Sequence, residues 1–135
     1  MQLNPSLIFN GRAEEALELY RDALGGNIEL TRYAESPMAN DICDEFKDKV
    51  LYGALRSPLG VVAAMDCSPE QGGQPGSNFS ITLNVESEAQ ADSTFSKLAD
   101  GGEITMPLGK TFWAERFGML KDRFGISWMV NYAKN

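Results

Sequence analysis

The residues of this chain that could do chemistry gather near its C-terminal end, and none of them is a histidine. The sequence of 135 residues contains no histidine at all. A 2-His-1-carboxylate iron site and any Ser-His or Cys-His nucleophile are therefore excluded, because each of them needs an imidazole. Near the C-terminal end, one carboxylate, Glu115, lies between two aromatic residues, Trp113 and Phe117.

Glu115 has two alternative roles. Alternation along a strand puts Trp113, Glu115 and Phe117 on one face, and a carboxylate between two aromatic side chains is unusual for a plain core. In a cleft, Glu115 would be a candidate catalytic base. At an edge, it would form an ordinary ion pair with Lys110 or Arg116.

A wider set of side chains is predicted to line a ligand-binding cleft with Trp113 and Phe117. Aromatic residues stack on planar or apolar ligands, and a few polar groups then fix the orientation of the ligand. The further residues predicted to bind the ligand are Phe9, Tyr52, Asp66, Trp128 and Asn131.

No metal or other cofactor is predicted. The polar residues at the expected strand ends are mostly neutral oxygen donors such as Asn84 and Asn131, which hold a transition metal weakly. An oxygen-only magnesium or manganese site that uses Asp66 stays an open alternative. Methionines in the expected strands are interpreted as core residues.

The elements that must position these residues occur twice. In each half, a short apolar strand precedes an amphipathic helix, a Gly-Gly pair ends the helix, and three more strands follow. The second helix has a capping box formed by Ser87 and Gln90. The pattern predicts an α+β fold of two tandem βαβββ modules whose curved mixed sheets surround a cleft. Duplication explains this pattern better than chance similarity of two αβ units does.

The module boundaries follow from composition. The sole linker-like stretch is the Pro-, Gly- and Ser-rich segment 68–77. We therefore expect one domain over residues 1–135, with a first module at 1–67 and a second at 78–135. A final hairpin of 112–120 and 126–132 would present Trp113 and Glu115.

Three segments carry a resemblance to a known family: Gly11 to Tyr20, Lys49 to Leu55, and Thr111 to Asn131. They resemble the PhnB-like branch of the vicinal oxygen chelate superfamily. This superfamily comprises glyoxalases, bleomycin resistance proteins and dioxygenases, and PhnB-like members are also labelled demethylubiquinone methyltransferase-like. The resemblance implies a homodimer whose sheets curl around small-molecule clefts. It also implies that a metal, when present, is held by His, Glu or Gln, but Tyr52 stands where the pattern has a His.

Bulk properties restrict the partners. The net charge of −7 and the lack of a long basic stretch argue against nucleic acid and against an anionic membrane surface. No apolar run has the length of a membrane span, so we expect a cytoplasmic protein. In that compartment Cys43 and Cys67 are expected to be reduced thiols.

The sequence thus predicts a metal-free protein that binds an unknown small molecule in an aromatic-lined cleft. The alternative is a lyase, isomerase or transferase of the same superfamily that uses the Glu115 or Asp66 carboxylate, with or without a divalent metal. A third alternative is a structural or regulatory dimer whose cleft is filled by its own side chains.

Overall fold

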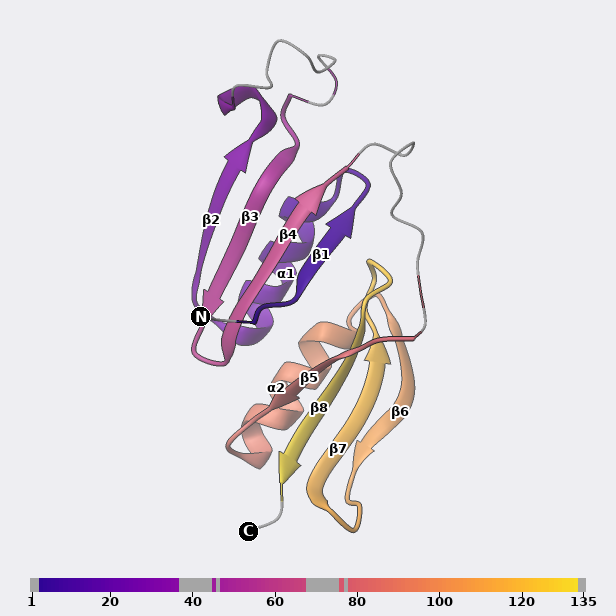
Figure 1. Cartoon of the computed structure of the whole chain (residues 1–135). Coiled ribbons are helices and arrows are strands. Elements are labelled where there is room, and N and C mark those ends of the chain that lie inside the picture. The colour runs from indigo at the N-terminus through magenta and orange to yellow at the C-terminus, as the bar shows by residue number, and fades with distance from the viewer. Residues whose placement is uncertain (1–2, 37–44, 46, 68–75, 77, 134–135) are drawn as a thin grey trace. The chain divides into compact units, whose positions relative to one another are not determined.

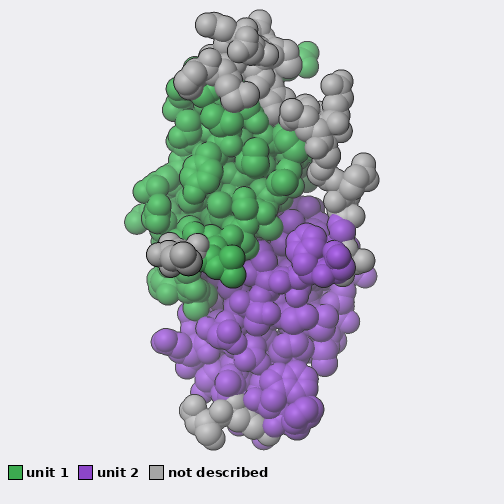
Figure 2. Space-filling view, in the orientation of Figure 1, with its two compact units in different colours: residues 1–21, 25–74 green, residues 22–24, 75–135 purple. Residues whose placement is uncertain are grey.

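The chain forms two compact units, which the computed structural model describes over residues 3–36, 45, 47–67, 76 and 78–133. One unit comprises residues 1–21 and 25–74, and the other comprises residues 22–24 and 75–135 (Figure 2). In each unit a helix lies against a four-stranded sheet (Figure 1). No helix in the described part of the chain is both long enough and apolar enough to cross a bilayer.

The first unit contains β1, α1, β2, β3 and β4, with a short 3₁₀ helix after β2. Their bounds are β1 Ser6–Phe9, α1 Ala13–Leu24, β2 Asn27–Arg32, the 3₁₀ helix Tyr33–Glu35, β3 Val50–Ser57 and β4 Gly60–Asp66. The strand order is β1-β4-β3-β2. β1 runs parallel to β4, and the other neighbours are antiparallel.

The second unit repeats this arrangement. Its elements are β5 Ile81–Asn84, α2 Glu88–Ala99, β6 Glu103–Gly109, β7 Ala114–Lys121 and β8 Ser127–Ala133. The strand order is β5-β8-β7-β6, with β5 parallel to β8. The predicted α+β fold of two tandem βαβββ modules is therefore confirmed.

Glycines allow each helix to approach its sheet, and they do so at matching places. A Cβ atom at Gly53 on β3 would lie 2.8 Å from Leu17 of α1, and one at Gly118 on β7 would lie 2.7 Å from Phe95 of α2. Real Cβ atoms do not approach other atoms so closely, so both positions favour glycine. This shared packing supports the interpretation of the two modules as duplicates.

The capping box predicted at α2 forms in part. Ser87 Oγ accepts a hydrogen bond from the Gln90 backbone N–H at 3.0 Å. Gln90 Oε1 accepts one from the Glu86 N–H at 2.9 Å rather than from the N–H of Ser87. The polar start of the helix is therefore satisfied as the sequence predicts, with the return bond shifted by one residue.

The start of α1 is held by a residue distant in sequence. Asp66, at the end of β4, is almost fully buried, and its Oδ1 accepts hydrogen bonds from the backbone N–H groups of Gly11 and Ala13, both at 2.9 Å. Its Oδ2 accepts one from the Val50 N–H at 2.9 Å. Asp66 thus joins β4, β3 and the first turn of α1.

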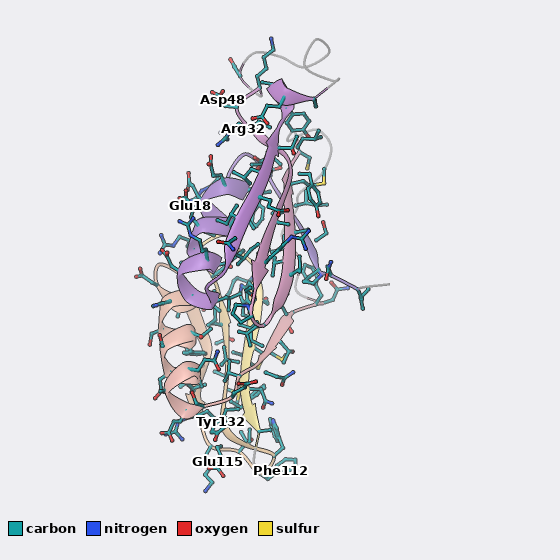
Figure 3. The ribbon with its side chains drawn as sticks, turned by 90° about the vertical axis from the view of Figure 1, so that its left-hand side faces the viewer. Glu18, Arg32, Asp48, Phe112, Glu115 and Tyr132 are labelled. Carbon is teal, nitrogen blue, oxygen red and sulfur yellow. The ribbon has the colours of Figure 1, made fainter. Side chains whose placement is uncertain are left out.

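An ion pair links α1 to the edge strand β2. Arg32 donates to both carboxylate oxygens of Glu14, with distances of 3.1 and 2.8 Å. It also donates to the backbone oxygen of Asp48, which lies beside it (Figure 3). The hydrogen bond from Arg32 lowers the pKa of Glu14, against a smaller opposing effect of burial. Because the folded-state pKa is lowered, the pair stabilises the fold above the unfolded pKa, and this contribution is lost as the pH falls through the folded pKa.

We predict that Glu14→Gln lowers the free energy of unfolding by less than about 1 kcal/mol at pH 7, because the pair is half exposed. The difference from the parent chain should shrink as the pH falls below 4.5, the ordinary value for glutamate. Urea unfolding at several pH values measures this. Glu18→Gln, an exposed change on the same helix, is the control. A difference that grows at low pH would contradict the assignment.

Several sequence predictions concern residues outside the described part of the chain. Cys43 and almost all of the proposed linker 68–77 belong there. Cys67 is described as a buried free thiol.

Candidate ligand-binding face

The face of the second sheet opposite α2 carries the residues of most interest. Gly118 faces α2, so Phe117 and Met119, its neighbours along β7, point to the other side of the sheet. Side chains directly across from one another on neighbouring strands share a face. We call this surface the methionine face, and its members are Thr82, Asn84, Met106, Phe117, Met119, Met129 and Asn131.

The strand register arranges these side chains in two adjacent rows. One row runs Thr82, Met129, Met119 and Met106, so that three thioethers lie on three neighbouring strands. The Thr82 hydroxyl donates to Met129 Sδ at 3.8 Å. The second row runs Asn84, Asn131, Phe117 and Gly109. An apolar row therefore lies beside a row that combines an aromatic ring with two amides.

Trp113 extends the methionine face although it does not lie in a strand. The Thr111 hydroxyl accepts a hydrogen bond from the Ala114 N–H, and Ala114 O accepts one from the Thr111 N–H, which closes a turn before β7. The predicted strand from Phe112 therefore starts later, at Ala114. The Trp113 ring still contacts Phe117 edge to face, with centroids 5.1 Å apart, and Trp113 is 44% exposed.

The two asparagines form a pair with one unmatched atom. Asn131 Nδ2 donates to Asn84 Oδ1 at 3.0 Å. Asn131 Oδ1 is buried and has no hydrogen-bond partner among the described residues. A buried acceptor without a donor costs stability, so this oxygen is a place where a ligand or a water molecule could gain a strong contact.

Glu115 lies at one end of the second unit, near Phe112 (Figure 3). Its Oε2 lies 3.9 Å from Lys110 Nζ, and both side chains are well exposed. Its backbone oxygen accepts a hydrogen bond from Arg116, whose guanidinium pairs with Glu88 and Asp92 of α2. Of the two alternative roles, the structure thus shows the contact with Lys110.

Comparison with known proteins identifies the family. A model described as the Glyoxalase/Bleomycin resistance protein/Dioxygenase superfamily matches residues 2–130. The chain belongs to this superfamily. Protein YjdN of Escherichia coli strain K12 is 29% identical to it, with 99% of this chain and 97% of YjdN covered.

Two solved structures resemble this chain along its whole length. Protein PA1353 from Pseudomonas aeruginosa has a TM-score of 0.89 and 40% identity, with 100% of this chain and 99% of that chain covered. A putative 3-demethylubiquinone-9 3-methyltransferase, PhnB protein, from Bacillus cereus has a TM-score of 0.76 and 25% identity, with 98% and 100% covered. The resemblance to the PhnB-like branch is confirmed.

Three of the residues predicted to bind the ligand are placed elsewhere by the structure. Phe9 is buried on the side of β1 that faces α1, beside its register partner Asp66. Trp128 is 1% exposed, on the α2 side of its sheet, and its indole N–H donates to Asp122 at 2.9 Å. Asp66 is occupied by three backbone N–H groups. These three residues are part of the core and do not join the candidate site.

Tyr52, another predicted ligand-binding residue, is a surface residue of the first unit. It is 53% exposed. Since its neighbour Gly53 faces α1, the Tyr52 side chain points to the opposite side of that sheet. The second unit brings together Trp113, Phe117 and Asn131.

The sequence interpretation missed three members of the face, Met106, Met119 and Met129, which it treated as core. A signal was available for two of them. Met119 follows Phe117 by two residues and Met129 precedes Asn131 by two, so strand alternation puts each methionine on the face of its predicted ligand-binding neighbour. The place of Met106 on this face could not be predicted in the same way, because it depends on the pairing between β6 and β7. The register of that pairing shifts on each side of Met106.

The oxygen and sulfur atoms of the methionine face are poor ligands for the metal ion that some members of the superfamily hold. Its polar members are a hydroxyl and two amides, and one amide oxygen already accepts a hydrogen bond. Within the described ranges, no three His, Cys, Asp or Glu side chains come together. Neutral oxygens and thioethers bind divalent first-row metals poorly.

Two of the hollows that the described residues form lie on the helix sides of the sheets. One of about 480 Å³ is lined by Phe95, Ser96, Lys97, Ala99, Asp100 and Ile104. One of about 280 Å³ is lined by Glu14, Glu18, Arg21, Ile28 and Leu30. Charged side chains with solvated ends contribute to both, and neither contains an aromatic pair of the kind that Trp113 and Phe117 form.

Proposed function

We propose that this chain is a small-molecule binding protein of the superfamily, and that the methionine face with Trp113 holds a planar, largely apolar ligand. The observation that carries the proposal is the half-exposed Trp113, packed edge to face on Phe117 beside a row of three methionines. Stacking on an aromatic side chain favours a planar ligand.

The methionines suit this role because of their chemistry. The thioether side chain is flexible and polarisable, makes favourable contacts with aromatic rings, and adapts to ligands of different shape. Asn131, beside Phe117, supplies the polar contact that such sites use to orient a ligand. The face therefore combines apolar area with one directional group.

The alternative of a lyase, isomerase or transferase gains no support from Glu115, whose carboxylate lies beside Lys110. The proposal keeps the homodimer implied by the family resemblance, a cytoplasmic location, and no nucleic-acid or membrane partner. It makes no use of a metal or another cofactor.

We predict that Trp113→Ala weakens the binding of indole, used as a planar probe, about tenfold, because one aromatic contact of about 1.4 kcal/mol is lost. Titration of the ¹⁵N-labelled chain, followed by NMR, measures the dissociation constants. Phe79→Ala is the matched control, since it removes another half-exposed aromatic side chain of the same unit. Equal affinities of the two variants, or no binding of indole to the parent chain, would overturn the proposal.

A further inference from the structure

We infer that the ligand of the methionine face carries a hydrogen-bond donor, an N–H or O–H group on a planar ring, that Asn131 Oδ1 accepts. This inference rests on the proposed function and deepens it by naming the class of ligand. The methionine face requires a donor on the ligand because the acceptor oxygen, Asn131 Oδ1, is buried and has no partner in the described part of the chain.

The Asn131 amide is hydrogen-bonded to its neighbour across the parallel strand pair. Its Nδ2 donates to Asn84 Oδ1 at 3.0 Å, which leaves its Oδ1 as the unmatched atom. The Asn131 backbone cannot shift easily to relieve this, because its carbonyl oxygen accepts the Val85 N–H at 2.9 Å. In this arrangement Oδ1 is the amide atom that can still accept a hydrogen bond from a ligand.

The aromatic side chains near Asn131 favour a ligand whose hydrogen-bond donor is attached to a planar ring. Phe117 lies opposite Asn131 on β7, and Trp113 packs on Phe117. Oδ1 is buried although Asn131 as a whole is only partly buried, so a ligand that contacts this oxygen must displace a neighbouring side chain. The flexible Met129, two residues along β8 on the same face, is suited to such a displacement. A donor without a ring would leave the apolar area unfilled, and a ring without a donor would leave the oxygen unmatched.

A matched pair of probes tests the requirement. Indole and benzofuran have almost the same shape, but indole presents an N–H donor where benzofuran presents an oxygen. We expect the parent chain to bind indole about tenfold more tightly than benzofuran, the ratio that one net hydrogen bond to a buried acceptor gives. NMR titration yields both dissociation constants.

Variants of Asn131 and Asn84 test whether the preference for indole over benzofuran comes from Asn131 Oδ1. Asn131→Leu keeps a similar volume without an acceptor, so indole and benzofuran should bind to this variant equally tightly. Asn131→Asp keeps an acceptor at this position and should retain the preference. Asn84→Ala removes the partner of Nδ2 and frees the Asn131 amide to rotate, so it should weaken the preference. Asn27→Leu, the same substitution as Asn131→Leu but at an exposed asparagine of the first unit, is the matched control and should retain the preference. Near-UV circular dichroism from the buried Trp128 reports whether each variant is folded.

The outcomes separate the two proposals. Equal binding of indole and benzofuran to the parent chain would overturn the donor requirement and leave the proposed function standing. A preference that persists in folded Asn131→Leu would also overturn it. Binding of neither probe would overturn the proposed function and the inference that depends on it.

Discussion

Asp66→Ala is expected to lower the free energy of unfolding of the first unit by about 3–4 kcal/mol, since it leaves buried N–H groups without an acceptor. The carboxylate is 1% exposed and accepts three backbone hydrogen bonds, from Gly11, Ala13 and Val50. It also holds a negative charge at the N-terminus of α1, where the helix dipole favours one. Both contributions are lost in the variant.

The loss of the hydrogen bonds to Asp66 should first affect the amides that donate to it. Hydrogen exchange of the Ala13 and Val50 amides should speed up strongly in Asp66→Ala, and urea unfolding followed by circular dichroism should give the change in free energy. Asp66→Asn should be intermediate, because one carboxamide oxygen can still accept while its –NH₂ opposes a backbone donor. The exposed Asp48→Ala is the control and should change stability by less than about 0.5 kcal/mol. Equal stability of Asp66→Ala and the control would show that the bonds to Asp66 contribute little.

Asp122→Ala is expected to cost about 3 kcal/mol in the second unit. Asp122 is 3% exposed and occupies the turn between β7 and β8. Its Oδ1 accepts the Phe124 and Ile126 N–H groups at 2.8 and 3.0 Å, and its Oδ2 accepts the Trp128 indole N–H at 2.9 Å. One side chain therefore shapes the turn and fixes the largest residue of the core.

The Trp128 indole N–H gives an NMR signal that reports directly on the hydrogen bond to Asp122. The indole N–H signal of Trp128 in an NMR spectrum should move and exchange faster in Asp122→Ala, while that of Trp113 should change little. Asp100→Ala is the matched control, because Asp100 pairs with Arg123 of the same turn through an exposed side chain. An unchanged Trp128 signal in the Asp122 variant would contradict the assigned hydrogen bond.

The sequence predicts those features of the fold that depend on near neighbours. The helix spacing, the Ser87 cap and the hairpin turns are local patterns, and each was placed within a few residues. The role of Asp66 was not predicted, because its partners Gly11 and Ala13 are distant in sequence and meet it only once β4 lies beside β1. The polar residue was therefore assigned to a cleft although it supports a helix.

The candidate site was predicted in part for the same reason. Trp113 and Phe117 are close in sequence, and their contact follows from the short segment that joins them. Trp128 and Asn131 were both assigned to one cleft, yet an odd separation along a strand puts them on opposite faces. Residue type alone suggests a shared cleft for the two side chains, but strand alternation separates them. The methionine row could not be predicted in full, because it depends on the register of three strands.

Methyl-labelled methionine shows whether the methionine face binds a planar ligand. Indole should be added to the chain carrying ¹³C-methyl methionine, and the methyl signals followed by NMR. We predict that the signals of Met106, Met119 and Met129 shift together with the Trp113 indole signal, with one common dissociation constant. If these signals stay in place while indole binds, or if only Met65 of the first unit responds, the ligand lies elsewhere and the methionine face is not the binding site.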